Sequence, residues 1–443
     1  MGIEEVMEPS AQPPRTRRRA GAVPIRHGRL RRRRVGSDLF KLLATVVAVV
    51  LVSAVGVTAY ATVDTLASRA HDIHLVNASG QAVSVPSIGA KSGEINILLA
   101  GTDTRSGQGG SFDTSEELAG SSGAGNNDVT MVLHVSADHT SATVISIPRD
   151  LMTPVPACPK SGGGTTSPES SAMFNSTLST GGLSCVVLTA EQLTGLTIPY
   201  AALITFDGVI ALSNAVGGVT VCLATPVNDP YTGLNLAAGE QTLQGANALA
   251  YLRSRHGVGD GSDLGRISDQ QLFLSALLRQ VTSAGVLSNP ITLYTLARAA
   301  VTNMQLSDTL SQPTTMIAIA VALKDISLSN FVFVQYPVTG DPTDPGRVLP
   351  DPDGAAALKT ALANDQPVQL TGTLGRATEA DPTATATATA TATPTASATP
   401  TSSAEASSSP GSTAAATTPP AATLPPSVTG QTAAQQTCTK GNN

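Results

Sequence analysis

The chain has 443 residues, of which 13% are charged and 3% are aromatic, and it contains no tryptophan. Eleven of its 26 lysines and arginines lie in residues 1–41, so the rest of the chain carries 15 basic against 28 acidic residues. That balance excludes a broad nucleic-acid-binding face, and the few arginines outside residues 1–41 are concentrated in short motifs that favour a local anion site.

Residues 42–61 form a run of twenty residues without a charge, directly after the basic segment 1–41. A helix of that length spans about 30 Å, the thickness of the hydrocarbon core of a bilayer. Because the positive charge precedes the run, we expect residues 1–41 in the cytoplasm and the chain after residue 61 outside. Ala59-Tyr60-Ala61 has the form of a cleavage site, so a signal peptide is the alternative to a membrane anchor.

Composition divides the remaining chain into three parts. Residues 62–92 are expected to be a short stalk, and residues 93–372 are long enough for one sizeable extracellular domain. Residues 373–443 are rich in Thr, Ala, Pro and Ser, with too little apolar surface to offset the entropy of ordering. They are predicted to be a disordered tail.

Hydrophobic patterns within 93–372 predict alternating strands and helices. The predicted strands are residues 94–100, 129–135, 142–147 and 219–223; the predicted helices are residues 188–196, 205–216 and 264–281. A Gly/Ser-rich insertion, 106–126, separates the first two strands and is expected to be a surface loop. Strands that alternate with helices predict an α/β protein, a layered α-β-α fold with a central mixed β-sheet.

All four cysteines follow the apolar run, where an oxidising compartment permits disulfides. Cys158, Cys185 and Cys222 lie in the domain and Cys438 in the tail. We expect one bridge within the domain. The third domain cysteine is then either free or joined to Cys438.

The segment "YLRSRHGVGDGSDLGRISDQQ" holds the densest group of arginines outside the N-terminal segment. If it begins as an extended strand, Arg253 and Arg255 point to the same side and present two guanidinium groups to phosphate oxygens. A helix beginning near residue 263 then places Arg266 and Gln270 on one face.

Further charged motifs lie at the ends of the predicted strands, where ligands gather in open α/β sheets. Asp103 and Arg105 follow the first strand, Asp128 precedes the second, and Arg149 follows the third. Two carboxylates with phosphate oxygens and water form an all-oxygen set that suits Mg²⁺, so these strand ends are a candidate metal site. For any one of these motifs alone, an ordinary Arg–Asp ion pair is the alternative.

The ordered motifs "NILLAGTDTR", "NNDVTMVLHVSADHTSATVISIPRD", "FNSTLSTGG", "AVGGVTVCL" and "GANALAYLRSRHG…SDLGRISDQQLFL" resemble the LytR-CpsA-Psr family of bacterial cell-wall enzymes. The resemblance implies transfer of an anionic glycopolymer from a polyprenyl pyrophosphate carrier to peptidoglycan, beside the membrane lipid that holds the carrier. It implies Mg²⁺, with Mn²⁺ as an alternative, on Asp103 and Asp128. The implied pyrophosphate ligands are Arg105, Arg149, Arg253, Arg255, Arg266 and Gln270.

Within that set the resemblance gives Arg149 and Arg255 catalytic roles, and Asp263 either aligns Arg266 or accepts the proton of the attacking hydroxyl. The family often has Arg directly before the Gln, where this chain has Asp269, which predicts a reduced positive charge at that corner. Apolar residues at 272–278 and 316–323 are predicted either to line a lipid tunnel or to form plain core. Two other functions stay open: a polyprenyl-pyrophosphate phosphatase, and a non-catalytic wall-polymer receptor or regulator.

Overall fold

The computed structural model describes residues 73–84, 93–105, 125–160, 162–283, 290–382 and 420–442. The basic segment 1–41, the apolar run 42–61 and most of the Gly/Ser-rich insertion therefore lie outside the described residues. Among the residues that are described, no helix is both long and apolar enough to cross a membrane.

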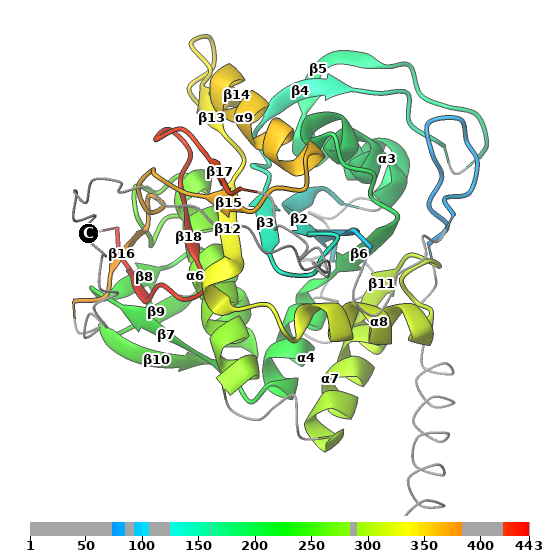
Figure 1. Ribbon diagram of the computed structural model, residues 1–443. Helices are drawn as coiled ribbons and strands as arrows, with labels where there is room; N and C mark the ends of the chain where they lie inside the picture. Colours follow the sequence, from blue (N-terminus) through cyan, green and yellow to red (C-terminus); the bar gives the residue numbers. More distant parts are fainter. Residues whose placement is uncertain are drawn as a thin grey trace, which may run out of the picture. The chain divides into compact units, whose positions relative to one another are not determined.

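A seven-stranded sheet with the order β11-β6-β1-β2-β3-β12-β18 forms the centre of the domain (Figure 1). The strands are β1 (Ile95–Thr102), β2 (Asn127–Val135), β3 (Ala142–Ser146), β6 (Tyr200–Ile204), β11 (Met304–Leu306), β12 (Phe331–Gln335) and β18 (Gly430–Thr432). The β1–β6 and β3–β12 pairs are parallel and the other neighbouring pairs are antiparallel. The predicted mixed sheet is confirmed.

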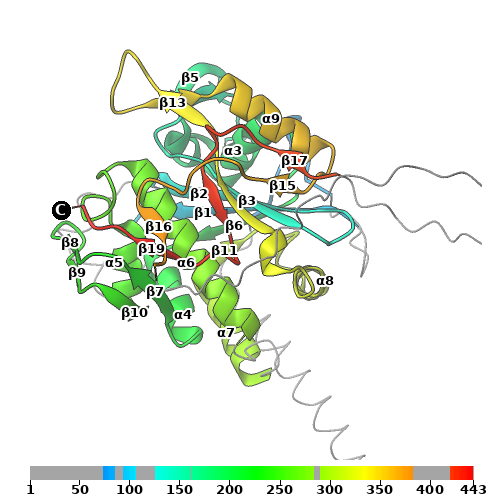
Figure 2. The same ribbon diagram turned by 60° about the vertical axis from the view of Figure 1, so that its left-hand side comes forward.

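Both faces of this sheet are buried. Successive side chains of a strand point to opposite faces, so each strand contributes to two core clusters. In β12, Val332 and Val334 join the core cluster that includes α3 (Thr177–Thr194) and α9 (Pro352–Ala363). Phe331 and Phe333 join the opposite cluster, which includes α8 (Pro313–Leu323) and part of α6 (Asp263–Ser283). Helices thus cover both faces, as predicted (Figures 1 and 2).

A second sheet, β10-β7-β19-β16, lies beside α6 (Figure 2). Its strands are β7 (Val219–Leu223), β10 (Gly239–Leu243), β16 (Thr378–Ala380) and β19 (Thr437–Thr439). Side chains of β7, α5 (Ala246–Arg253) and α6 share one apolar cluster, in which Tyr251 and Leu272 are almost fully buried. This cluster fixes α6 between the two sheets.

The remaining elements are short. Four two-stranded pairs are formed by β4 (Met152–Val155) with β5 (Glu169–Met173), β8 (Val227–Asp229) with β9 (Leu234–Leu236), β13 (Val338–Gly340) with β14 (Val348–Pro350), and β15 (Val368–Gln369) with β17 (Ala422–Thr423). The helices α4 (Phe206–Ala215) and α7 (Pro290–Asn303) pack together, and η2 (Phe174–Ser176) and η4 (Leu328–Asn330) are single 3₁₀ turns.

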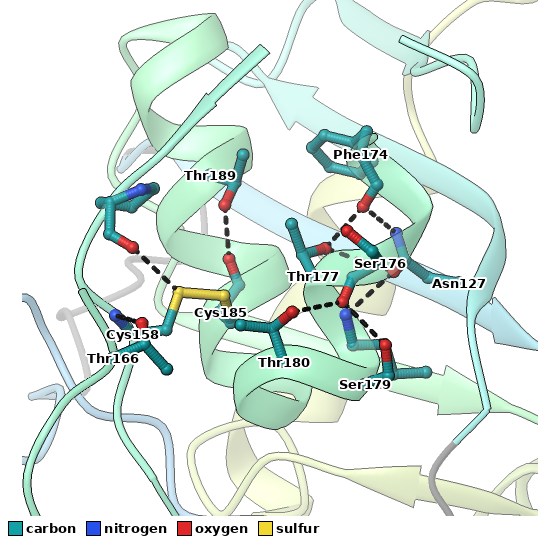
Figure 3. Close-up of a disulfide and its surroundings, with 12 residues drawn as sticks. Asn127, Cys158, Thr166, Phe174, Ser176, Thr177, Ser179, Thr180, Cys185 and Thr189 are labelled. Atoms are coloured by element: carbon teal, nitrogen blue, oxygen red, sulfur yellow. Dashed lines mark hydrogen bonds between the residues drawn. A yellow bond between two sulfur atoms is a disulfide. The ribbon is translucent and has the colours of Figure 1, made fainter. Parts of the chain in front are cut away.

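The predicted helix at 188–196 is part of a longer helix, α3, which begins at Thr177. Gly181 and Gly182 interrupt its helical geometry, and Gly182 has a φ of 66°. This kink hides the helical periodicity of the first turn. A Cβ at Gly181 would lie 2.7 Å from Cys158 Cβ, so glycine is required beside the Cys158–Cys185 disulfide, which Figure 3 shows.

The prediction of a stalk over residues 62–92 is wrong for residues 73–84. Leu75 is 1% exposed and belongs to the main core. The backbone amide of Ile73 donates to the carbonyl of Leu306 at 2.9 Å, which ties this segment to β11. The short apolar group around Leu75 is followed by polar residues, so it offers too few positions for a periodicity that could reveal its burial.

The prediction of a disordered tail over 373–443 is wrong at both ends of that range. Residues 373–382 include β16, and residues 420–442 include β17, β18 and β19, so the chain returns to both sheets. Leu424 and Val428 enter the main core, and Cys438 forms a disulfide with Cys222. Residues 383–419 lie outside the described residues.

The two disulfides settle the alternatives that the cysteines left open. Cys158–Cys185 is the expected bridge within the domain, and Cys222 pairs with Cys438 rather than remaining free. Cys222 and Cys438 are directly opposite in the parallel pairing of β7 with β19. The disulfide and the strand pairing therefore both hold the C-terminal segment against β7.

Candidate active site

Asp103 and Asp128 lie at the same end of the β1–β2 pair. The register pairs Gly101 with Val129 but Thr102 with Asn127, so Asp128 is the extra residue of a bulge. A bulge re-aims its side chain relative to the regular pleat. Asp103 Oδ1 accepts the amide of Asn126 at 2.6 Å, which ties the residue after β1 to the residue before β2.

Arg149 follows β3 and connects this end of the sheet to α6. Its Nη1 donates to Asp128 Oδ1 at 3.0 Å, and its Nε lies 3.8 Å from Asp263 Oδ1. Burial alone would lower the pKa of Arg149, but Asp128, Asp263 and Asp150 together raise it above the usual value. Arg149 is therefore a fixed positive charge that no physiological pH removes.

Two buried asparagines hold the backbone around Arg149. Asn127 Nδ2 donates to the carbonyl of Phe174 and its Oδ1 accepts the amide of Leu178, so it joins the start of β2 to the η2–α3 junction (Figure 3). The amide of Asn175 donates to the carbonyl of Arg149 at 3.1 Å. The motif "FNSTLSTGG" thus holds the backbone at Asn127 and Arg149 through hydrogen bonds and supplies no charge to the site.

The first turn of α6 contributes Asp263 and Arg266, which are 5% and 7% exposed. Arg266 Nη2 lies 2.5 Å from Asp263 Oδ1 and donates to the carbonyl of Asp128 at 2.8 Å. This ion pair is the contact that alignment of Arg266 by Asp263 requires, and the role of Asp263 stays a prediction. Burial raises the pKa of Asp263, although Arg266 and Arg149 act in the opposite direction.

Arg255 is positioned by a residue that sequence reasoning missed. Asp229, which is fully buried, accepts from the amides of Arg255 and Gly257 at 3.1 and 3.3 Å and from Ser254 Oγ at 2.8 Å. Burial favours the neutral acid, but these hydrogen bonds outweigh it and lower the pKa of Asp229. Asp229 lies in the β8–β9 hairpin, and nothing in its local sequence indicates this long-range contact.

The prediction that Arg253 and Arg255 share one side of a strand is wrong. Arg253 is the last residue of α5, and the backbone becomes extended only at Ser254. The guanidinium carbon of Arg253 lies 4.3 Å from the centroid of the Phe206 ring in α4. The helical periodicity of "ANALAYLR" overrides the alternation from which the strand was inferred.

The other predicted ligands are placed as follows. Gln270, 3% exposed, donates from Nε2 to the carbonyl of Leu252 at 3.0 Å, so its side chain joins α6 to the end of α5. Arg105 is half-buried, two residues beyond Asp103. Their roles as pyrophosphate ligands stay predictions.

Asp269 lies inside the fold, and its effect on the charge of the site stays a prediction. It is fully buried in α6, and its Oδ1 accepts from Thr439 Oγ1 at 2.9 Å. Burial raises the pKa of Asp269 well above its usual value. The hydroxyl of Tyr251 lies 2.5 Å from Thr439 Oγ1, so Asp269 joins a buried network that attaches β19 to α5 and α6.

A cavity of about 380 Å³ opens beside the arginines. Asp150, Arg255 and Asp263 line it together with Arg347 and Arg376, which the sequence did not indicate as site residues. A cavity of similar size, about 370 Å³, lies against β7 and α6 and is lined by none of the predicted site residues. Because Arg255 and Asp263 line the first cavity, it is the better candidate for the substrate-binding site.

The structure also bears on metal binding. Asp103 and Asp128 each commit one carboxylate oxygen, to Asn126 and Arg149, and each retains a second oxygen. Hard oxygen ligands of this kind fit Mg²⁺. In the described part of the chain, three metal-type ligands converge at Cys222, Asp381 and Cys438, but both sulfurs are in a disulfide and cannot bind as thiolates.

The segments predicted to line a lipid tunnel mostly pack as core. Leu272, Phe273 and Ala276 belong to the cluster beneath β7, and Ile319 and Ala322 belong to a cluster on the central sheet. On α8, Ile317 and Val321 are 63% and 37% exposed. The plain-core alternative accounts for the buried members.

Comparison with known proteins agrees with the sequence resemblance. A sequence model of the LytR_cpsA_psr family matches residues 57–361. The chain is 33% identical over 328 residues to the cell wall biosynthesis protein LcpA of Corynebacterium glutamicum, a match covering 69% of this chain and 61% of LcpA. It is 38% identical over 208 residues to the probable cell wall biosynthesis protein LcpB of that organism, covering 46% of each chain.

More distant matches extend the comparison. The chain is 29% identical over 189 residues to the polyisoprenyl-teichoic acid–peptidoglycan teichoic acid transferase TagU of Oceanobacillus iheyensis, covering 43% of this chain and 52% of TagU. A LytR-Csp2A-Psr enzyme from Actinomyces oris matches 67% of this chain and 96% of its own, at 22% identity and a TM-score of 0.48. The chain thus spans between about half and three fifths of the length of LcpA, LcpB and TagU.

Proposed function

Because the chain belongs to the LytR-CpsA-Psr family, we propose that it moves an anionic glycopolymer from a polyprenyl pyrophosphate carrier to peptidoglycan at the outer face of the membrane. The name of the related TagU, a polyisoprenyl-teichoic acid–peptidoglycan teichoic acid transferase, supports this reaction class. The observation that carries the proposal is the group of arginines, Arg149, Arg255 and Arg266, gathered around the buried Asp263.

The arginines suit a pyrophosphate for three reasons. Guanidinium groups bind phosphate oxygens through two parallel hydrogen bonds. Arg266 and Asp263 lie in the first turn of α6, where the helix dipole adds positive potential. Arg255 Nε is buried and lacks a hydrogen-bond partner within the described residues, so a bound oxyanion would satisfy it.

The reaction is phosphoryl transfer, in which positioning and charge neutralisation supply most of the catalysis. The oxygen of a muramic-acid hydroxyl attacks the sugar-side phosphorus, its proton passes to Asp263, and the bond to the departing polyprenyl phosphate breaks. Arg149 and Arg255 stabilise the charge that moves onto the leaving group. The raised pKa of Asp263 makes it a better base than an ordinary carboxylate.

Asp103 and Asp128 would hold Mg²⁺, or Mn²⁺ in its place, with phosphate oxygens and water as further ligands. Such an ion supplies Lewis-acid stabilisation of phosphate charge. The ion pair between Asp128 and Arg149 links the proposed metal ligand to the proposed pyrophosphate ligand. Binding of the pyrophosphate and of the ion would therefore be coupled.

Membrane attachment through residues 42–61 belongs to the same proposal. A carrier lipid stays in the bilayer, so an anchored catalytic domain meets it at the membrane surface. The charge asymmetry around the run supports a cytoplasmic N-terminus and an extracellular domain. No nucleic acid takes part.

The test is product analysis with a synthetic polyprenyl-pyrophosphate glycan donor and peptidoglycan acceptor, with and without Mg²⁺. The proposal predicts a phosphodiester-linked product that requires the ion. Release of free glycan phosphate in place of that product would indicate the phosphatase. Binding of the glycan without any turnover would indicate the receptor.

A further inference from the structure

Two arginines that the proposed pyrophosphate grip does not use enter the same cavity from distant parts of the chain. Arg347 comes from the β13–β14 hairpin, and Arg376 comes from the segment before β16. They share the cavity of about 380 Å³ with Arg255 and Asp263. Three arginines from three separate segments therefore line one cavity.

The hairpin holds Arg347 at the edge of the site. The amide of Val348 donates to the carbonyl of Asp150 at 3.2 Å, and Leu151 forms a bridge with Val348. Arg347 Nη1 donates to Asp150 Oδ1 at 3.3 Å, while the side chain remains 32% exposed. Its Nε also lies 3.9 Å from Asp344 Oδ2. Within the described residues Nη2 makes none of these contacts, so it retains its donors for a ligand.

The C-terminal part of the fold holds Arg376. The carbonyl of the next residue, Ala377, accepts the amide of Lys440 at 2.8 Å, and the amide of Gly259 donates to the carbonyl of Lys440 at 2.9 Å. A Cβ at Gly259 would lie 2.8 Å from Ala377 Cβ, so the two backbones are in close contact. Arg376 is thereby attached to the loop that also carries Arg255.

The charges of the cavity leave room for an anion. Arg255, Arg347 and Arg376 outnumber the two carboxylates that line it, Asp150 and Asp263. Arg376 also pairs with Asp260 at 2.8 Å, but these side chains are 53% and 43% exposed, and exposed ion pairs are weak and easily shared. Arg255, which also lines the cavity, has a buried Nε without a hydrogen-bond partner in the described chain.

We propose that Arg347 and Arg376 form a second oxyanion subsite, which binds a peptide carboxylate of the peptidoglycan acceptor. The inference rests on the proposed function. Asp263, the proposed proton acceptor, lines this cavity, so the molecule that fills the cavity presents its hydroxyl to Asp263. That molecule is the acceptor, and its stem-peptide carboxylates are the anions it carries.

The experiment uses the detergent-solubilised full chain and a muramyl peptide in two forms, with free carboxylates and with the carboxylates converted to amides. Calorimetric binding to wild type is compared with binding to Arg347→Gln/Arg376→Gln, and with Arg376→Gln alone. Lys324→Gln is the matched control, because Lys324 is 52% exposed, pairs with the adjacent Asp325 and does not line the cavity.

We expect the double variant to bind the free-carboxylate peptide about tenfold more weakly than wild type and the Lys324→Gln control do. The amidated peptide should bind all of them equally weakly. In turnover, the acceptor KM should rise by a similar factor while the donor KM stays unchanged.

Equal binding of both peptides by wild type, or unchanged binding in both arginine variants, would overturn the subsite. A raised donor KM with an unchanged acceptor KM would also overturn it, because the anion would then belong to the glycopolymer. The peptide-binding measurement contains no donor, so it tests the subsite separately from the transfer reaction. Failure of the proposed function is therefore distinguishable from failure of the subsite. It would appear as a wild-type chain that binds the peptide through Arg347 and Arg376 yet forms no linked product.

Discussion

Removal of the Cys222–Cys438 disulfide should destabilise the domain more than removal of Cys158–Cys185. The two bridges span 216 and 27 residues, and loop-closure entropy gives contributions of about 5.4 and about 3.6 kcal/mol at 25 °C. The larger loop joins the C-terminal segment to β7, beside the Asp269–Thr439 contact with α6. Loss of this bridge should therefore also loosen the helix that carries Asp263.

The assay is urea unfolding of the double variants Cys222→Ser/Cys438→Ser and Cys158→Ser/Cys185→Ser, with free energies of unfolding extrapolated to water. We expect the first variant to be less stable than the second by about 2 kcal/mol, the difference between the two loop-closure contributions. An equal or smaller loss for the first variant would refute the reasoning. The C-terminal segment would then unfold independently of the domain.

Three further predictions concern single side chains. Arg149→Ala should lower transfer about 10²–10³-fold without unfolding the domain, because one charge-stabilising donor contributes roughly 3–4 kcal/mol at the transition state; wild-type turnover by the folded variant would count against its role. Arg253→Ala should retain most transfer and lose about 1 kcal/mol of stability with its Phe206 contact, and a loss as large as that of Arg149→Ala would return Arg253 to the active site. Because the pKa of Asp269 is raised on folding, wild type loses stability as pH rises from about 4 towards that raised pKa. The melting temperature of Asp269→Asn should therefore gain on that of wild type as pH rises above about 4, and a difference that stays constant with pH would contradict this.

Local sequence patterns were sufficient to place the site residues that lie at the ends of predicted strands or within one predicted helix. Asp128 and Arg149 flank predicted strands, and Asp263 and Arg266 are three residues apart in the first turn of a predicted helix. Position at strand ends therefore indicated the first pair, and spacing along one helix indicated the second. The mixed sheet followed from the same kind of periodicity.

Contacts between distant segments could not be predicted in this way. Asp229 reaches Arg255 through a hairpin, and Arg347 and Arg376 enter the cavity only because separate segments pack beside it. The C-terminal strands have a composition typical of disorder, and they are ordered by pairing with β7 and β12 and by a disulfide. Arg253 was misplaced because a short helix and a strand were confused.

The central claim is that the arginine group binds a polyprenyl pyrophosphate. The most direct measurement is mass spectrometry of lipid extracted from the full chain purified in mild detergent, for wild type and for Arg149→Ala/Arg255→Ala. The account predicts a polyprenyl pyrophosphate-linked saccharide with wild type and a large depletion of it with the double variant. A wild-type chain that carries no such lipid, or a folded variant that carries as much of it, would contradict the account.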